Sequence, residues 1–333
     1  MADQAPLKAT FFAFQKREPG GVLVRAASAT IVSLLVLWGL SFAVAFRLLG
    51  PDFYRSWTAI APDGSPPAHL FPPHLAELML LNLVVLAAFF VLFAAFESAC
   101  ISWMLRGQAN PFPYLKFDAD TWRVYGTYWF WLVFSVLAYI GFIVLILVVA
   151  LAAGAIASVA KPASTIIGVL GGLACFAYPF LWLRTAVRFA PAAATSIGVG
   201  AFAPLKAWSA TRKRFWALFG SYFLVILCNY VLILILFALV YGAALSNLDW
   251  SLSRSDPQAF SAAFNKAIMD AVAEPFSNVT SAVRLIVVEV AFYLATLMLA
   301  VIGFGIAARA VQAALSENKI VPEAPTPSPS AAS

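Results

Sequence analysis

Long uncharged stretches dominate the hydrophobic pattern of this chain of 333 residues. Six stretches of at least 19 residues contain no Asp, Glu, Lys or Arg. They are Ala26–Phe46, Leu78–Phe96, Val124–Ala160, Pro162–Leu183, Phe215–Leu248 and Val290–Ala308. Because a helix of roughly 20 apolar residues crosses the ~30 Å hydrocarbon core of a bilayer, each stretch predicts a membrane-spanning helix.

The pattern therefore predicts an all-α fold, a polytopic membrane helical bundle with six transmembrane helices and short interfacial helices. The predicted spans are residues 26–47, 77–104, 125–158, 163–186, 217–243 and 286–309, within a membrane domain over 26–315. Residues 1–25 precede this domain as a cytoplasmic segment. Residues 316–333 follow it, and we expect this tail to be disordered because its Pro- and Ser-rich end has little apolar surface to bury. Apolar residues at helical spacing predict a short surface helix within 257–281.

Composition agrees with a membrane location. Charged residues make up 11% of the chain, against about 25% in soluble domains. The cysteines, Cys100, Cys175 and Cys228, lie in or beside predicted spans and show no disulfide or zinc spacing. No phosphate-binding loop, nucleophile elbow or metal-ligand motif occurs. We therefore expect no catalytic residues, no metal, no cofactor and no enzymatic activity.

Basic residues predict the orientation of the spans, because loops rich in Lys and Arg stay in the cytoplasm. The side that carries both termini receives 15 Lys and Arg residues, and the opposite side receives 6. Both termini are therefore expected to be cytoplasmic, in a multi-pass protein of the bacterial inner (plasma) membrane.

The two internal cytoplasmic loops resemble each other. The first reads FPYLKFDADTWR over residues 112–123, and the second reads FAPLKAWSATRK over 202–213. The following spans begin with YGTY and FGSY, after four additional residues in the second copy that one extra helical turn would absorb. The similarity predicts a parallel repeat of one helical hairpin. Chance similarity between sequences of low complexity is the alternative.

Basic and aromatic residues interleave in these loops. Tryptophan favours the headgroup level, where cations reach anionic lipid, and each basic residue there contributes about 1 kcal/mol. The candidates for lipid or partner contact are Lys116, Arg123, Lys206, Trp208, Arg212, Lys213, Arg214 and Trp216. Their role is either to anchor the topology or to bind anionic membrane lipids or a protein. We expect no nucleic acid, because the charges lie against a bilayer.

Three polar residues lie in or at the ends of spans, where ionisable groups tend to be functional. Glu97 ends the second span, where it could pair with Arg106 or Arg184, and Glu289 begins the sixth, where it could pair with Arg284. Alternatively, either glutamate serves as a functional acid. Asn229 lies near the middle of the fifth span and is either a packing hydrogen-bond partner or a substrate contact.

The fourth span contains further helix-shaping residues. Pro179 is expected to kink it because proline lacks a backbone N–H donor. Gly168 and Gly172 form a pair of small residues four apart, which predicts close packing against another span or a second copy of the chain.

The segment from Arg188 to Phe223 carries a family resemblance. Pro191 follows the fourth span, Ala207–Thr211 reads AWSAT, and Arg214–Trp216 reads RFW at the entry to the fifth span. These features resemble the second half of the membrane domain in membrane-bound glycerophosphoryl diester phosphodiesterases and related stand-alone six-helix bacterial proteins. In those phosphodiesterases a catalytic barrel follows the membrane domain. Here about 18 residues follow the last predicted helix, so the resemblance implies architecture and location, not activity.

These observations favour a non-enzymatic scaffold or accessory subunit, with a protein partner or a second copy of the chain as further binding candidates. The alternative is a transporter or lipid-handling protein, in which Pro179, Asn229 and the two glutamates would line a path.

Overall fold

The fold is all-α. The computed structural model describes residues 21–58, 74–107, 114–115, 117–157 and 160–322, and every secondary-structure element among them is a helix. Six helical segments are long and apolar enough to cross a membrane. They are Leu23–Gly50, Leu75–Arg106, Ala119–Ala157, Pro162–Val199, Phe215–Ser246 and Val279–Ser316. The predicted fold class is confirmed.

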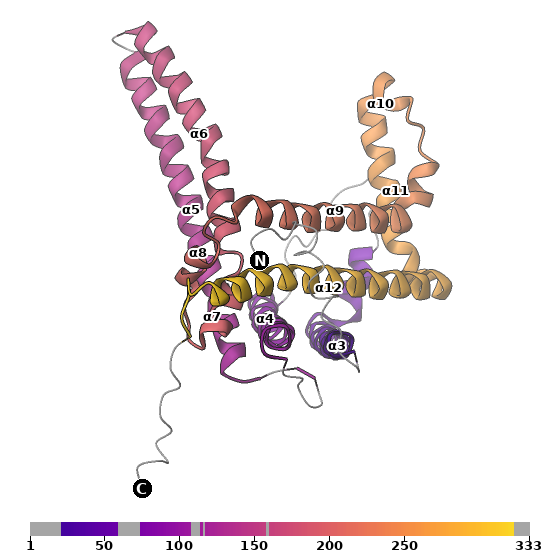
Figure 1. Cartoon of the computed structure of the whole chain (residues 1–333). Helices are drawn as coiled ribbons and strands as arrows, with labels where there is room; N and C mark the ends of the chain where they lie inside the picture. Colours follow the sequence, from indigo (N-terminus) through magenta and orange to yellow (C-terminus); the bar gives the residue numbers. More distant parts are fainter. Residues whose placement is uncertain (1–20, 59–73, 108–113, 116, 158–159, 323–333) are drawn as a thin grey trace. The chain divides into compact units, whose positions relative to one another are not determined.

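The helices follow one another along the chain (Figure 1). They are α3 (Val22–Thr58), α4 (Leu75–Arg106), α5 (Ala119–Ala157), α6 (Lys161–Phe189), α7 (Ala192–Val199), η1 (Pro204–Lys206), α8 (Ala207–Ala210), α9 (Phe215–Ser246), α10 (Leu252–Ser255), α11 (Pro257–Ser277) and α12 (Val279–Ser316). The six predicted spans coincide with α3, α4, α5, α6, α9 and α12. Most of these helices are longer than predicted, because charged and polar residues extend them beyond the apolar stretches.

The chain divides into two compact units. Of the described residues, the first unit comprises those within 21–22, 94–223 and 302–322, and the second those within 23–93 and 224–301. The first unit thus contains α5 to α8 with the adjoining ends of α4, α9 and α12. Both loops that the sequence singled out belong to this unit.

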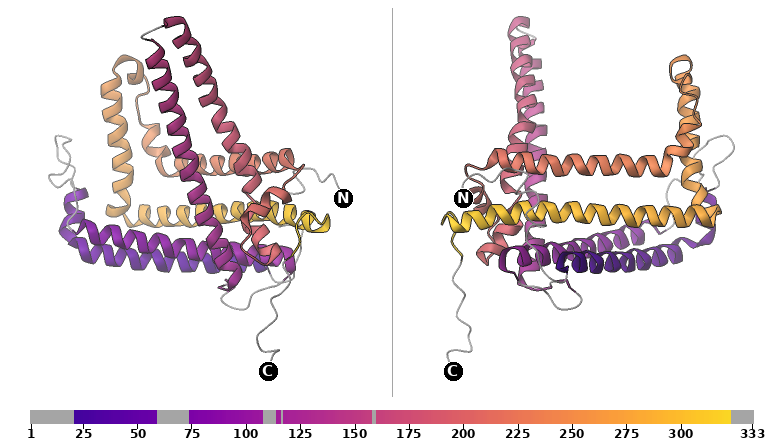
Figure 2. Two further views of the ribbon diagram at one scale, coloured as in Figure 1. Left: turned by 90° about the vertical axis from the view of Figure 1, so that its left-hand side faces the viewer. Right: turned by 45° about the vertical axis from the view of Figure 1, so that its right-hand side comes forward.

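Within the first unit, α5 and α6 form a helical hairpin (Figure 2). A side chain at Gly171 would overlap with Val149 of α5, so this glycine permits the close approach. By contrast, Gly168 and Gly172 have no neighbouring atoms within 4 Å of where a Cβ would lie. Within the described chain the close contact is therefore at Gly171 and not at the predicted pair, because Gly171 faces the neighbouring helix. Packing of Gly168 and Gly172 against a second copy of the chain stays a prediction.

The core of the first unit lies where the ends of several helices meet. Phe96 of α4 is fully buried and packs edge-on against Phe304 of α12, with ring centroids 5.8 Å apart. At Gly198 of α7, an added Cβ would come within 2.7 Å of Val311. Small residues therefore let α7 pack tightly against the end of α12.

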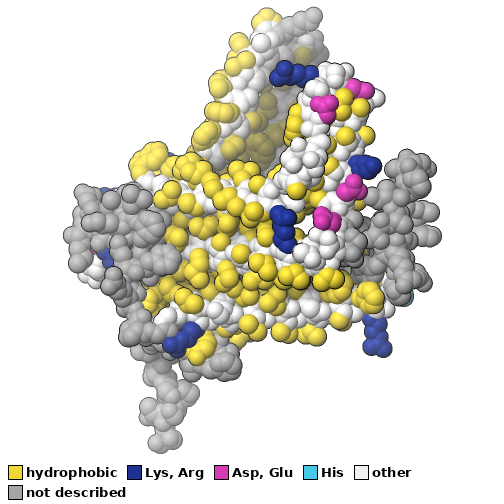
Figure 3. Space-filling view, turned by 90° about the vertical axis from the view of Figure 1, so that its right-hand side faces the viewer, with side chains coloured by type: hydrophobic (Ala, Val, Ile, Leu, Met, Phe, Trp, Pro, Cys, Tyr) yellow, Lys and Arg dark blue, Asp and Glu magenta, His cyan; other side chains and the backbone are white. Residues whose placement is uncertain are grey.

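In the second unit, the segment for which apolar spacing predicted a helix forms α11, of 21 residues. Its position at the membrane surface stays a prediction. Asp256 caps α11, since the Asp256 carboxylate accepts hydrogen bonds from the backbone N–H groups of Gln258 and Ala259. Trp250 packs on Phe260, with ring centroids 5.5 Å apart. Figure 3 shows acidic and basic side chains on this segment, whereas hydrophobic side chains cover much of the long helices in view.

Candidate functional site

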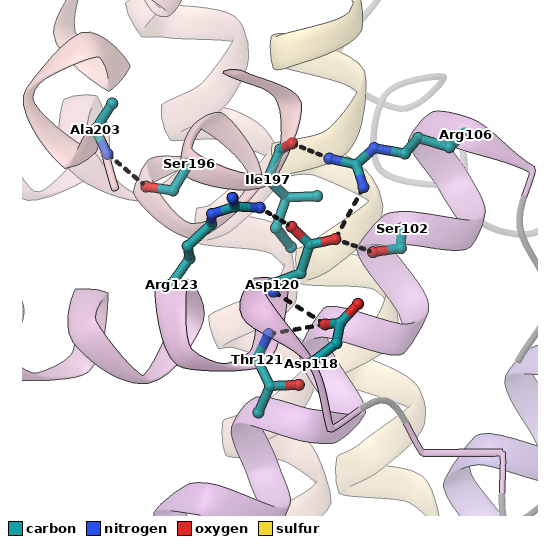
Figure 4. A network of polar contacts seen from close by, with 9 residues as sticks. All are labelled: Ser102, Arg106, Asp118, Asp120, Thr121, Arg123, Ser196, Ile197 and Ala203. Atoms are coloured by element: carbon teal, nitrogen blue, oxygen red, sulfur yellow. Dashed lines mark hydrogen bonds and ion pairs between the residues drawn. The ribbon is translucent and has the colours of Figure 1, made fainter. Parts of the chain in front are cut away.

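A buried carboxylate, Asp120, organises the end of the first loop. Its side chain is 3% exposed, and Arg106 Nη1 lies 2.9 Å from Asp120 Oδ2. Arg123 pairs with the other oxygen, Oδ1. Figure 4 shows the carboxylate between the two guanidinium groups. Two cations therefore compensate one buried anion.

Local sequence explains why Asp120 lies there. Asp118 caps α5, and its Oδ1 accepts hydrogen bonds from the backbone N–H groups of Asp120 at 2.9 Å and Thr121 at 3.4 Å. An acid in the first turn of a helix is stabilised by the helix dipole. Arg106 also donates a hydrogen bond to the carbonyl of Ile197 near the end of α7. The network thus joins α4, α5 and α7.

The second loop has a different backbone from the first. In the first loop the helix α5 begins at Ala119 and continues into the span. In the second, α8 ends at Ala210, and Lys213 adopts a left-handed conformation with φ of 69° before α9 begins at Phe215. The four additional residues fall at Phe215–Leu218 and form the first turn of α9, in agreement with the expected extra helical turn. The difference between the loops is the turn at Thr211–Arg214, which the first loop replaces by continuous helix.

Burial agrees at some positions of the proposed repeat and differs at others. Thr121 and Thr211 match in the two loops and are both buried. The hydroxyl of Thr211 lies 3.0 Å from the carbonyl of Ala207 and 3.3 Å from that of Arg188. Leu115 is 7% exposed, however, whereas its counterpart Leu205 is 67% exposed. The repeat itself remains a prediction.

The eight candidate contact residues separate into groups. Lys116 lies outside the described residues. Arg123 and Arg214 form internal ion pairs, with Asp120 and Glu317 respectively. The remaining five are exposed and form what we call the basic-aromatic surface. It consists of Lys206, Trp208, Arg212, Lys213 and Trp216.

The start of the C-terminal tail is ordered, contrary to the expected disorder from residue 316. Glu317 pairs with Arg214 and, at 2.6 Å, with Lys319. Ile320 is 4% exposed. We call residues 316–320 the tail clasp; residues 323–333 lie outside the described part of the chain. The prediction failed here because one long-range ion pair, with Arg214, and burial of Ile320 stabilise this segment.

The tail clasp follows from the way α12 ends. Asn318 is left-handed with φ of 55°, and the N–H of Lys319 bonds to the carbonyl of Ala314 at 3.0 Å, as in a Schellman motif. The hydrogen bond from Lys319 lowers the pKa of Glu317 below its ordinary value of 4.5, and the charge of Arg214 lowers it further. The carboxylate therefore stays ionised at neutral pH.

Arg188, at the end of α6, packs against the second loop. Its guanidinium carbon lies 4.5 Å from the ring centroid of Trp208, within the range of a cation–π contact. The ring of Phe189 lies 5.6 Å from that of Trp208. Sequence reasoning did not single out Arg188 as a contact residue, because its aromatic partner is twenty positions away in the chain.

Glu97 is buried and accepts a hydrogen bond from the hydroxyl of Tyr128, at 2.6 Å. The expected pairing of Glu97 with Arg106 or Arg184 is not seen, because Arg106 binds Asp120 instead. Asn229 and Glu289 belong to the second unit and are half-buried. Arg284, the expected partner of Glu289, donates to the carbonyl of Leu239 at 3.1 Å.

Within the described part of the chain, no group of three His, Cys, Asp or Glu residues is placed to hold a metal ion. No protein-family model matches the chain, and neither a curated protein nor a solved structure matches it significantly. Its function therefore has to be inferred from its own residues.

Proposed function

We propose that this multi-pass membrane protein is a non-enzymatic scaffold or accessory subunit of the bacterial inner membrane, and that its basic-aromatic surface contacts anionic lipid headgroups. The observation that carries the proposal is the exposure of three cations beside two tryptophans at the entry to an uncharged span. Lys206, Arg212 and Lys213 form no ion pair with the described residues. These cations are therefore available to a negatively charged surface.

The aromatic residues support a position at the headgroup level. Trp216 is the second residue of α9 and is 77% exposed, and Trp208 is 41% exposed. Tryptophan favours the boundary between hydrocarbon and water, and basic residues near anionic lipid contribute about 1 kcal/mol each. For the three unpaired cations this amounts to about 3 kcal/mol, or roughly a hundredfold in affinity.

A role without catalysis is supported by how the acids of the first unit are used. Asp120 is held between two arginines, and Glu317 is paired with Arg214 and Lys319. Glu97 accepts a hydrogen bond from Tyr128. These contacts hold helices and loops together, as a scaffold requires. The groove of about 320 Å³ between α5 and α6 is lined mainly by apolar and aromatic residues, which favours a scaffold over a polar transport path.

We also propose a relationship to the membrane domain of membrane-bound glycerophosphoryl diester phosphodiesterases. Three motif positions coincide with element boundaries, which supports it: Pro191 precedes α7, Ala207–Ala210 form α8, and Phe215 begins α9. The proposal concerns architecture and carries no phosphodiesterase activity.

The test is lipid retention by the full chain purified in native-lipid particles, measured by mass spectrometry. A chain with Lys206→Gln, Arg212→Gln and Lys213→Gln should retain phosphatidylglycerol with roughly a hundredfold lower affinity. A control with Arg47→Gln, Arg254→Gln and Lys266→Gln removes the same charge from exposed positions elsewhere in the chain. Equal lipid binding by both variants would contradict the lipid-contact role. If a protein co-purifies in stoichiometric amount and is lost from the first variant alone, that surface is a protein-docking site.

A further inference from the structure

Arg188 differs from the other arginines that the first unit holds in place. Arg106, Arg123 and Arg214 each pair with a carboxylate. Among the described residues, no acid pairs with Arg188, and its Nε atom is buried without a hydrogen-bond partner. A guanidinium that is held in place but lacks an anion has the property of a ligand-binding group.

Stacking on Trp208 holds the Arg188 side chain in place, and a contact with Thr211 joins the Arg188 backbone to the second loop. Its guanidinium group stacks on the ring of Trp208, 4.5 Å from the centroid. Its backbone carbonyl lies 3.3 Å from the hydroxyl of Thr211, which is fully buried. The side chain therefore does not have to be ordered when a ligand binds, which reduces the entropic loss.

The surroundings indicate which anion is available. Arg188 lies in the last turn of α6, at the end of a predicted span, and Trp208 lies between the cations Lys206 and Arg212 of the basic-aromatic surface. The anionic group found at this depth of a bilayer is the phosphate of a phospholipid. Arginine binds phosphate through parallel N–H donors, and the planar group can stack on an aromatic ring at the same time.

We infer that Arg188, stacked on Trp208, is a specific subsite for the phosphate group of one anionic phospholipid. This inference rests on the proposed lipid contact and sharpens it. The basic-aromatic surface attracts many lipids by charge, whereas Arg188 retains one of them by geometry. Lys206 and Arg212 lie two and four residues from Trp208 in the chain, and their positive charge favours the same anionic lipid.

The experiment is native mass spectrometry of the full chain in detergent micelles titrated with phosphatidylglycerol. Arg188→Gln should weaken binding of the first lipid about tenfold and leave the later, weaker lipids unchanged. Arg188→Lys keeps the charge but loses the parallel N–H donors of the planar guanidinium, so it should weaken binding of the first lipid several-fold. The matched control is Arg212→Gln, which should weaken all bound lipids by a similar, smaller factor.

The outcomes separate this inference from the proposed function. If Arg188→Gln and Arg188→Lys both retain the first lipid with unchanged affinity while the triple variant of the basic-aromatic surface binds weakly, the subsite is wrong and the lipid-contact role stands. If the triple variant also binds normally, both are wrong. If inorganic phosphate displaces the first lipid at equal concentration, the site recognises soluble phosphate, and the lipid assignment is overturned. Circular dichroism of Arg188→Lys shows whether the variant retains its helices.

Discussion

Arg106 of α4 and Asp120 of α5 form an ion pair, with Nη1 of the arginine 2.9 Å from Oδ2 of the aspartate. The pair closes the first loop, because the two residues flank it on either side. Arg123 pairs with the same carboxylate, and Arg106 also reaches the carbonyl of Ile197. The network of Asp120 and Arg106 thus holds three helices of the first unit together.

Replacing Asp120 by Asn should destabilise the first unit. Arg106 and Arg123 would then face each other without a neutralising charge. Because one partner of a largely buried pair is removed, while Arg106 remains partly exposed, we expect a loss of about 2 to 3 kcal/mol. Thermal unfolding of the purified protein in detergent micelles measures the change.

Asp118→Asn is the matched control for that experiment. The Asp118 side chain accepts hydrogen bonds from two backbone N–H groups at the start of α5, and asparagine can do the same. This variant should unfold within a degree or two of the unaltered protein. Equal destabilisation by both substitutions would show that the charge of Asp120 is not what holds the helices together.

The α5–α6 hairpin should depend on Gly171. Gly171→Leu would place a side chain against Val149, and overpacking of this kind costs about 1 to 3 kcal/mol. Gly172→Leu makes the same chemical change at an exposed position with open space around it. Unfolding measurements on both variants should show a lower midpoint for the first alone. If Gly172→Leu lowered the unfolding midpoint instead, the close contact would lie on the helix face that carries Gly168 and Gly172.

The hydrogen bond from Tyr128 to Glu97 should stabilise the first unit. Tyr128→Phe leaves a buried acid without its observed donor, which costs about 1 to 3 kcal/mol. Tyr125→Phe removes the hydroxyl of a nearby tyrosine on the same helix, whose ring packs on Trp122 and Trp129, and serves as the control. If the two variants unfold at the same temperature, the bond contributes nothing measurable.

The tail clasp should open at low pH. The pKa of Glu317 in the folded protein is below its ordinary value of 4.5, so ionised Glu317 stabilises the folded form above that value. This stabilisation is lost as the pH falls below 4.5 and through the folded pKa. A spin label at Val321, which is 66% exposed, should become more mobile over that range. Glu317→Gln should give a mobile label already at pH 7. An unchanged label in that variant would mean that burial of Ile320 alone holds the tail clasp.

The number of spans and the helix α11 could be read from the sequence. Whether a segment crosses a bilayer depends on its own length and apolar content, since the backbone satisfies its hydrogen bonds within the helix. The period of apolar residues after Pro257 likewise depends on neighbours in the chain. Both properties are local, so no knowledge of distant contacts was needed.

The partners of the polar residues required the tertiary structure. The orientation rule counts only Lys and Arg, so it did not draw attention to Asp120, although Asp120 pairs with two of the arginines. Glu97 binds Tyr128 rather than an arginine, and Gly171 rather than Gly168 or Gly172 faces the neighbouring helix. Uniformly apolar helices give no sequence signal for which side faces a neighbour, because packing between them rests on shape and on single hydrogen bonds.

The sequence by itself determined that this is an all-α membrane protein with six long apolar helices, because insertion is governed by local composition. The tertiary structure decided which cations remain available. It pairs Arg106, Arg123 and Arg214 with acids, and it leaves Lys206, Arg212, Lys213 and Arg188 without an acid among the described residues. That division depends on which helix ends meet in space, and such contacts join residues that lie far apart in the chain.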